Sequence, residues 1–340
     1  MNIGKKIGLE TGPPTRDAFG EALAELGEKN ANLVVVDGDV ANSTRTEYFG
    51  EAFPTRFFNL GIAESNLVGV ASGLAASGKT VVAASFAAFL LGNAYDQIRM
   101  GIAYPQANVK LVGSHSGISI GEDGPSQMGI EDIALATSLP HFTVIVPADA
   151  PSTEAATKAL FSFDGPAYLR TGRPKTPIVY PNEVPFQVGK ANQLRNGRHA
   201  TIIACGLMVA AALEAAHTLR EEGIEVRVLD MHTIKPLDET AVIRAAQQTG
   251  AIVTAEEHLL DGGLGTAVAA CVVQHHPVPM RFVGIRNRYA ESGDPQSLLE
   301  KYGLMPENIA QAVREAIDHK ENNGDGLLVI EFTDGEDQEE

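Results

Sequence analysis

The sequence predicts an α/β protein made of a doubly wound parallel sheet followed by a second, smaller α/β unit. Three observations support this fold class. The chain has 340 residues, which is enough for two cores of ordinary size. Hydrophobic residues make up 44% and charged residues 20% of it, as in globular proteins. Short β-branched runs alternate with longer amphipathic segments, a pattern typical of parallel strands joined by helices.

The elements of the first domain follow from this alternation. The run Leu33-Val34-Val35-Val36 is wholly apolar, so helices should cover both faces of its sheet. The expected strands are 33–36, 56–60, 80–84, 109–112, 142–146 and 167–169. The expected helices are 17–28, 64–76, 89–100, 129–137 and 152–161.

A proline-rich segment, residues 171–185, has no amphipathic period and marks the domain boundary. We expect a first domain at 1–175, a linker at 176–190, a second domain at 191–320 and an acidic, mobile tail at 321–340. The expected strands of the second domain are 200–204, 225–229, 251–255 and 280–283, and its expected helices are 207–222, 238–249 and 265–274. The second domain shows no obvious chemistry.

Composition excludes several classes of protein. The net charge of −17 argues against binding to nucleic acid, which requires a basic surface. No apolar run approaches the ~18 residues of a membrane span, and the N-terminus lacks the apolar stretch of a secretory signal. Cys205 and Cys271 each lie in an apolar run and are expected to be buried thiols. A cytoplasmic location is therefore expected.

Polar and aromatic residues follow successive strands at the positions where open parallel sheets bind ligands. Asp39, Glu64, Phe86 and His115 each come shortly after an expected strand. A carboxylate at the start of a tightly packed helix can be kept from water and share a proton with a bound heterocycle. Taken singly, Glu64 could simply favour the positive end of its helix. Together, the residues favour one site.

Two further segments belong to this candidate site. Phe86 and Phe89, three residues apart, offer flat faces on which a planar ring could stack, although core packing is the commoner use of such residues. The loop at 115–129 is long, glycine-rich and charged, which suits a substrate-facing segment better than a core segment.

The same residues resemble the pyrimidine-binding domain of transketolases, especially the animal type. The matching motifs are Gly61-Ile62-Ala63-Glu64, Phe86-Ala87-Ala88-Phe89, Gly113-Ser114-His115 and Gly121-Glu122-Asp123-Gly124-Pro125-Ser126-Gln127. The resemblance continues through 96–100, 170–174 and, in the second domain, 233–238, and it covers about residues 14 to 318. It implies a pyrimidine-binding domain followed by a transketolase C-terminal domain.

The resemblance implies a thiamine diphosphate enzyme that transfers a two-carbon ketol unit from a ketose phosphate to an aldose. Glu64 matches the glutamate that hydrogen-bonds the aminopyrimidine ring and favours its reactive tautomer. Phe89 matches the aromatic residue that stacks on this ring, and Phe86 lines the same pocket. Asp39 matches an acidic residue near the cofactor and the subunit interface.

The resemblance also implies residues that bind substrate. His115 and Asp123 match residues that hydrogen-bond the sugar hydroxyls. Gln127 stands where many microbial enzymes have a histidine, so that an amide would orient the intermediate and act with Glu64 and His115 in catalysis. Arg16, Ser43 and Arg170 match the clamp for the sugar phosphate, a role that suits guanidinium groups.

The second half of such a site is missing from this sequence. Full-length transketolases carry a Gly-Asp-Gly motif, followed some distance later by asparagine, that holds Mg²⁺ (or Ca²⁺) and the diphosphate. Gly324-Asp325-Gly326 is the one such tripeptide here and lies too near the end of the sequence. We therefore expect no metal site in this chain, which should be the C-terminal subunit of a split transketolase. A separate N-terminal subunit would bind the metal, and this chain would form a homodimer within an α2β2 heterotetramer.

Three alternatives stay open. A β subunit of a 2-oxoacid dehydrogenase E1 component has a similar architecture, but His115 and the phosphate-clamp arginines suit sugars better than oxoacids. A fragment of a 1-deoxyxylulose-5-phosphate synthase is the second alternative. A non-catalytic regulatory or assembly subunit is disfavoured because Glu64 is intact. The sequence leaves open whether the enzyme serves the pentose phosphate route or specialised sugars.

Overall fold

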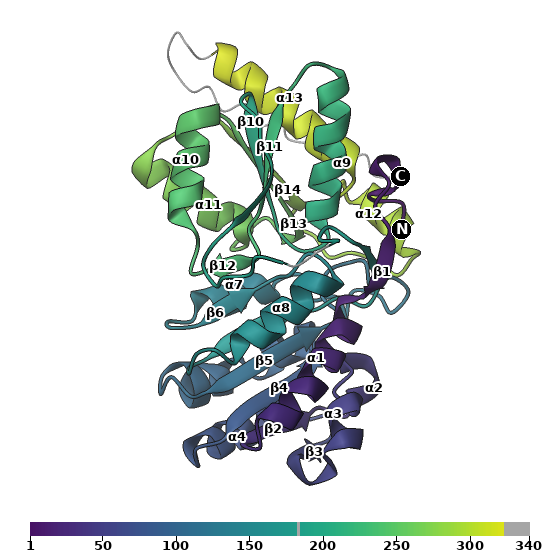
Figure 1. The fold of residues 1–340 in the computed structure, drawn as a ribbon, viewed down its shortest axis with the longest axis vertical. Coiled ribbons are helices and arrows are strands. Elements are labelled where there is room, and N and C mark those ends of the chain that lie inside the picture. Colours follow the sequence, from purple (N-terminus) through teal and green to yellow (C-terminus); the bar gives the residue numbers. More distant parts are fainter. Residues whose placement is uncertain (182–183, 323–340) are drawn as a thin grey trace.

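The computed structural model describes residues 1–181 and 184–322. It contains two α/β units, stacked one on the other in Figure 1. The first is built on a seven-stranded sheet of order β12-β6-β7-β5-β4-β2-β3. Its strands are β2 (Leu33–Asp37), β3 (Phe57–Asn59), β4 (Thr80–Phe86), β5 (Val109–Ser114), β6 (Thr143–Ile145), β7 (Ala167–Arg170) and β12 (Thr233–Lys235). All pair in parallel except β12, which is antiparallel to β6.

Helices cover both faces of this sheet because its central strands are apolar on both sides. Along β4, Val81 and Ala83 pack on one face, while Val82 and Ala84 pack on the other. The first face carries α4 (Glu64–Ala76), α5 (Ala87–Asn93) and α7 (Asp132–Ser138). The second carries α1 (Thr15–Lys29) and α8 (Ala150–Leu160). The doubly wound fold expected from the sequence is confirmed.

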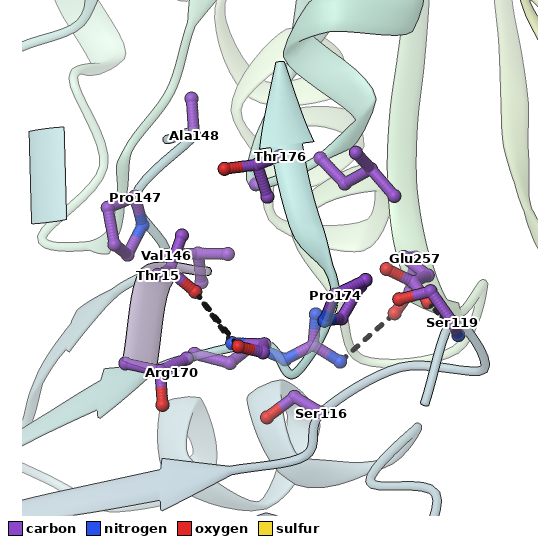
Figure 2. Close-up of a pocket in the computed structure, with 14 residues that line it drawn as sticks. Thr15, Ser116, Ser119, Val146, Pro147, Ala148, Arg170, Pro174, Thr176 and Glu257 are labelled. Atoms are coloured by element: carbon purple, nitrogen blue, oxygen red, sulfur yellow. Dashed lines mark hydrogen bonds between the residues drawn. The ribbon is translucent and has the colours of Figure 1, made fainter. Parts of the chain in front are cut away.

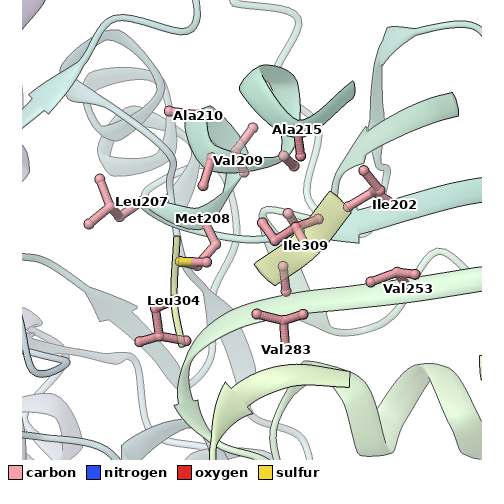
Figure 3. Packing of buried hydrophobic residues seen from close by; sticks show 14 of the residues in the cluster. Ile202, Leu207, Met208, Val209, Ala210, Ala215, Val253, Val283, Leu304 and Ile309 are labelled. Carbon is pink, nitrogen blue, oxygen red and sulfur yellow. The ribbon is translucent and has the colours of Figure 1, made fainter. Parts of the chain in front are cut away.

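The second unit has a five-stranded sheet of order β14-β13-β10-β11-β9, again covered on both faces (Figure 1). Its strands are β9 (Asn192–Arg195), β10 (Ala200–Ala204), β11 (Val226–Asp230), β13 (Ile252–Leu259) and β14 (Met280–Ile285). Its helices are α9 (Met208–Glu221), α10 (Glu239–Thr249), α11 (Leu264–His275), α12 (Pro295–Lys301) and α13 (Pro306–Asn322). Figure 3 shows the core on the α9 and α13 face, where Ile202 and Val253 meet Met208 and Ile309.

Several local expectations differ from the structure. The helix expected at 89–100 is divided into α5, α6 (Tyr95–Gln97) and a π-helix at Ile98–Ala103. The helices α12 and α13 were not predicted at all. Residues 321–322 belong to α13, and the rest of the expected acidic tail lies outside the described residues, as do Gly324-Asp325-Gly326.

The two units exchange elements across the expected domain boundary. Strand β12, from the second half of the sequence, extends the first sheet through its pairing with β6. In the other direction, the N-terminal turn Lys5–Ile7 reaches the second unit, where Gly4 N–H donates to Glu214 at 2.5 Å. β1 (Thr11–Pro14), which precedes α1, pairs antiparallel with β8 (Lys175–Pro177), which follows β7. Among residues 1–181 and 184–322, no helix has both the length and the apolarity needed to cross a membrane.

Candidate active site

Glu64 begins α4 and is buried, with 5% of its surface exposed. The chain enters this helix through Gly61, whose φ of +75° is a conformation that glycine adopts without strain. Ser85, near the end of β4, donates a hydrogen bond from Oγ to Glu64 Oε1 at 2.9 Å. A neutral hydroxyl is thus the observed donor to this carboxylate, and no arginine or lysine pairs with it among the described residues.

Three rings follow one another beside Glu64. The centroids of Phe86 and Phe89 lie 5.9 Å apart with an interplanar angle of 13°. Phe86 also stacks on His115, with the ring centroids 4.0 Å apart and an interplanar angle of 16°. Phe86 is therefore engaged by two protein rings, whereas Phe89 ends the stack and can offer a face to a further planar ring.

His115 is buried and neutral at physiological pH. Burial lowers its pKa to about 3, and the positive charge of Arg16 adds to this shift. Arg16 Nη1 lies 3.4 Å from His115 Nε2, and Ser114 Oγ lies 2.9 Å from Nδ1. Because a guanidinium can only donate, Nε2 must accept and Nδ1 must carry the proton. The structure thus defines one imidazole tautomer.

Arg16, Ser43 and His115 meet in one place, whereas the resemblance groups Arg16 and Ser43 with Arg170. Arg16 lies in the first turn of α1 and donates from Nη1 to the backbone oxygen of Ser43 at 3.1 Å. Its Nε is buried without a hydrogen-bond partner among the described residues. Arg16 is half-buried, and the same Nε lies 3.8 Å from Asp17 Oδ1, an ion pair that is too long for a hydrogen bond. A guanidinium that keeps a donor free of hydrogen bonds is suited to an anionic ligand. Burial and the nearby Arg45 lower the pKa of Arg16, which a bound anion would reverse.

The segment that carries Asp39 and Ser43 is held by a buried aspartate that sequence reasoning missed. Asp37, at the end of β2, accepts hydrogen bonds from Val40 N–H and from the hydroxyls of Thr44 and Thr46, all within 2.8 Å. Burial raises the pKa of Asp37. Asp39 itself is exposed and accepts from Asn59 Nδ2 at 2.6 Å, so it lies at the edge of the site.

The loop after β5 places Asp123 and Gln127 near the surface. Asp123 accepts from Arg173 Nη1 at 3.2 Å, and the same nitrogen donates to the backbone oxygen of Ile120 at 3.1 Å. Gln127 accepts a hydrogen bond from the neighbouring Ser126 hydroxyl. Both side chains are therefore reachable from solvent, and Arg173, for which the sequence suggested no separate role, orients the first of them.

Arg170 does not lie with Arg16 and Ser43 as an exposed clamp. Its guanidinium is buried and donates from Nε to Asp132 Oδ2 at 2.7 Å and from Nη2 to Asp132 Oδ1 at 3.1 Å. The same Nη2 also donates to the backbone oxygens of Gly129 and Glu257. Tyr168 adds a hydroxyl to Asp132 at 2.6 Å. Arg170 thus joins the first domain to β13, and its part in a phosphate clamp stays a prediction.

A small pocket of about 40 Å³ lies between the two units beside Arg170. Figure 2 shows that Thr15, Ser116, Arg170 and Glu257 approach it from the first domain and from β13. Glu257 is buried, and its Oε1 accepts from Ser119 N–H at 2.6 Å. The second domain therefore contributes a carboxylate to the loop after β5, a link that the sequence did not reveal.

Comparisons with known proteins place these features in one family. Residues 11–178 match the family described as transketolase, pyrimidine binding domain, and residues 189–309 match transketolase, C-terminal domain. A putative transketolase C-terminal section from Methanocaldococcus jannaschii is 42% identical over 303 residues, 88% of this chain and 95% of that protein. The 6-deoxy-6-sulfo-D-fructose transketolase subunit SqwH of a Clostridium species is 41% identical over 306 residues, 90% of this chain and 95% of that protein.

Longer relatives and a solved structure also match the transketolase family. Human transketolase is 43% identical over 307 residues, which are 89% of this chain but 49% of that protein. The chain thus spans about half the length of such relatives. A solved structure described as a split-gene transketolase, inactive beta4 tetramer, superimposes with a TM-score of 0.85 and 46% identity, covering 91% of this chain and 100% of that chain.

Proposed function

Because this chain belongs to the transketolase family and carries its pyrimidine-binding and C-terminal domains, we propose that it is the C-terminal subunit of a split transketolase. In this proposal, the enzyme transfers a two-carbon ketol unit from a ketose phosphate to an aldose. The observation that carries the proposal is the buried Glu64 at the start of α4. Ser85, which donates to its carboxylate, directly precedes Phe86 of the ring stack that ends at Phe89. A non-catalytic regulatory or assembly subunit would have no need of such a carboxylate.

The described residues fit the pyrimidine half of thiamine diphosphate. Glu64 Oε1 already accepts from Ser85, and its carboxylate can share a proton with a ring nitrogen. Phe89 can stack on the ring. When bound, thiamine diphosphate supplies the carbanion chemistry of ketol transfer. Glu64 would hold a proton at the ring nitrogen, and His115, neutral and hydrogen-bonded by Arg16, would orient the substrate.

The diphosphate and its metal ion require oxygen ligands on a second platform. Among residues 1–181 and 184–322, no group of three or more His, Cys, Asp or Glu side chains is placed to hold a metal ion. We propose that a separate N-terminal subunit supplies this platform and that two copies of each chain form the enzyme. The relative described as a C-terminal section and the structure described as a split-gene transketolase support this arrangement.

The proposed substrate is a ketose with an anionic end group. Arg16 Nε, beside Ser43 and His115, makes no hydrogen bond among the described residues and has only a 3.8 Å ion pair with Asp17. A phosphate dianion uses such donors well. The Clostridium relative is described as acting on a sulfonated sugar, which has a comparable anionic end.

The test is reconstitution with an N-terminal transketolase subunit, followed by assays with fructose 6-phosphate, 6-deoxy-6-sulfofructose and pyruvate as donors. We expect turnover with a phosphorylated or sulfonated ketose, dependence on thiamine diphosphate, and none with the lone chain. Turnover with pyruvate but with neither ketose would support the dehydrogenase or deoxyxylulose-phosphate alternatives instead. Full activity of the lone chain would refute the split enzyme.

A further inference from the structure

The second domain holds a cavity that the proposed reaction does not use. It measures about 230 Å³ and lies between α10 and the edge of the five-stranded sheet formed by β9 and β11. The lining residues are Lys190, Ala191, Gln193, Arg227, Leu229, Asp238, Thr240, Ala241 and Arg244. These residues come from a different unit than Glu64 and Phe89, so the cavity is separate from the candidate active site.

Positive charge gathers around this cavity although the chain as a whole carries a net charge of −17. Lys190, Arg227 and Arg244 line it, against a single carboxylate, Asp238. Both carboxylate oxygens of Asp238 already accept hydrogen bonds, from the backbone N–H groups of Ala241 and Ala191, each at 3.1 Å. Lys190 reaches the same carboxylate only at 3.8 Å. The cavity therefore keeps an excess of positive charge.

Arg227 is the most informative of these residues because it is buried. Only 7% of its surface is exposed, and Nη2 donates to Gln248 Oε1 at 2.8 Å. Its Nε has no hydrogen-bond partner within residues 1–181 and 184–322, and no described carboxylate pairs with its charge. A buried guanidinium in this state lacks the pairing that normally offsets its desolvation.

The neighbouring cation makes the arrangement less stable without a ligand. Burial lowers the pKa of Arg227, and the positive charge of Arg244 lowers it further. Arg244 is exposed and forms no ion pair within the described part of the chain. Two guanidinium groups that repel each other at a cavity are stabilised by an anion that bridges them, and phosphate oxygens match guanidinium donors in charge and geometry.

We propose that this cavity is a second anion-binding site, which takes inorganic phosphate or a small phosphate monoester through Arg227, Arg244 and Lys190. Arg227 Nε supplies the buried donor, and the exposed side chains of Arg244 and Lys190 close over the ligand from the rim. Asp238 holds the start of α10 and the backbone at Ala191 in place, so it positions the cations and does not touch the ligand.

The test is isothermal titration of the full chain with inorganic phosphate and, separately, with glycerol 3-phosphate. The test variants are Arg227→Met and Arg244→Gln. The control is Arg198→Gln, which removes one positive charge elsewhere in the same domain, where Arg198 pairs with the exposed Glu225. An Arg16→Gln variant removes the candidate clamp of the active site. Arg244 is exposed, so its variant should fold even if the Arg227 variant does not.

We expect saturable binding that persists in Arg16→Gln, where the candidate clamp of the active site no longer contributes. This binding should weaken about tenfold or more in Arg244→Gln and Arg227→Met and stay unchanged in Arg198→Gln. Tighter binding of glycerol 3-phosphate than of phosphate would identify an ester as the ligand, and equal binding would identify the free ion. Binding that is lost in Arg16→Gln but kept in Arg244→Gln would overturn the proposal, as would the absence of saturable binding.

Discussion

Arg16 controls both the charge and the hydrogen-bond direction of the candidate active site. Its Nη1 joins His115 to the backbone of Ser43. Its Nε makes no hydrogen bond among the described residues and lies 3.8 Å from Asp17 Oδ1. One guanidinium therefore holds the imidazole in a single tautomer and also keeps a donor for an anionic substrate.

Replacement of Arg16 by glutamine is expected to weaken recognition of the anionic end of the donor. Loss of one charge-assisted hydrogen bond is worth about 1.5–3 kcal/mol, so KM for a phosphorylated ketose should rise roughly tenfold or more. Steady-state kinetics of the reconstituted enzyme measure this. The KM for a ketose without the phosphate should change little, and an equal rise for both donors would contradict the assignment.

His115 should stay neutral well below the pH at which exposed histidines take up protons. Its folded pKa is about 3, whereas the unfolded value is about 6.5. The unfolded chain therefore binds more protons between these values, so the contribution of His115 to stability is complete above about pH 6.5 and decreases as the pH falls toward 3.

Nuclear magnetic resonance of ¹³C-labelled imidazoles tests this directly. We expect a resonance that does not titrate between pH 8 and 5, that remains in the wild-type chain and disappears in His115→Gln. His232 and His258 also have pKa values lowered to about 4 by burial, so the variant is needed to assign the signal. A midpoint near 6.5 for His115 would contradict the burial and the pairing with Arg16.

At the scale of elements, the loop after β5 is fastened to β13 by close packing. Gly117 has φ +80°, and a Cβ built on it would lie 2.3 Å from Glu257 Cδ, a carboxylate that is itself buried. The backbone N–H of Ser119 then donates to the same side chain at 2.6 Å. The substrate-facing loop thus depends on the second domain for its position.

Substitution of Gly117 by alanine should separate this loop from β13. Gly223 provides the matched control, since it has φ +81° but nothing within 4 Å of a built Cβ. Gly223→Ala should lower the free energy of unfolding by only ~1–2 kcal/mol, the cost of a left-handed backbone conformation for a residue with a Cβ. Gly117→Ala should lower it by clearly more. Urea unfolding of both variants measures the difference. Equal losses would show that Glu257 does not fix the loop.

The elements also show what the sequence could and could not predict. The apolar strand 33–36 and the helix beginning at Glu64 were predicted because their periodicity is local. The π-helix at Ile98–Ala103 divides a segment whose composition is typical of one continuous helix, and tertiary packing decides its form. The pairing of Thr233–Lys235 with β6 joins residues far apart in sequence, for which no local signal exists.

The same distinction holds for the candidate site. The family resemblance groups Arg16 and Ser43 with Arg170 as a phosphate clamp and assigns His115 to the sugar hydroxyls. The structure brings Arg16, Ser43 and His115 together. Arg170 carries the matching motif, yet the structure gives it Asp132 as a buried partner. The sequence could not reveal this pair, nor the approach of Glu257, because both depend on contacts between distant segments.

At the scale of the whole molecule, the two units are joined by contacts in both directions. Strand β12 extends the first sheet, the N-terminal turn packs on α9, and the buried Arg170 donates to β13. These contacts join the domain that carries Glu64, Phe89 and His115 to the second domain. In the proposed enzyme, a partner subunit would complete the site.

The central claim is that the buried carboxylate of Glu64 serves the cofactor. The test is ketol-transfer turnover of the reconstituted enzyme carrying Glu64→Gln. Glu47→Gln serves as a control, since Glu47 begins α3 (Glu47–Ala52) and pairs with Arg45 at 3.2 Å. We expect a loss of about 10²–10⁴-fold in kcat for Glu64→Gln, an unchanged fold by circular dichroism, and near wild-type turnover for the control. Near-normal turnover of the Glu64 variant would contradict the central claim.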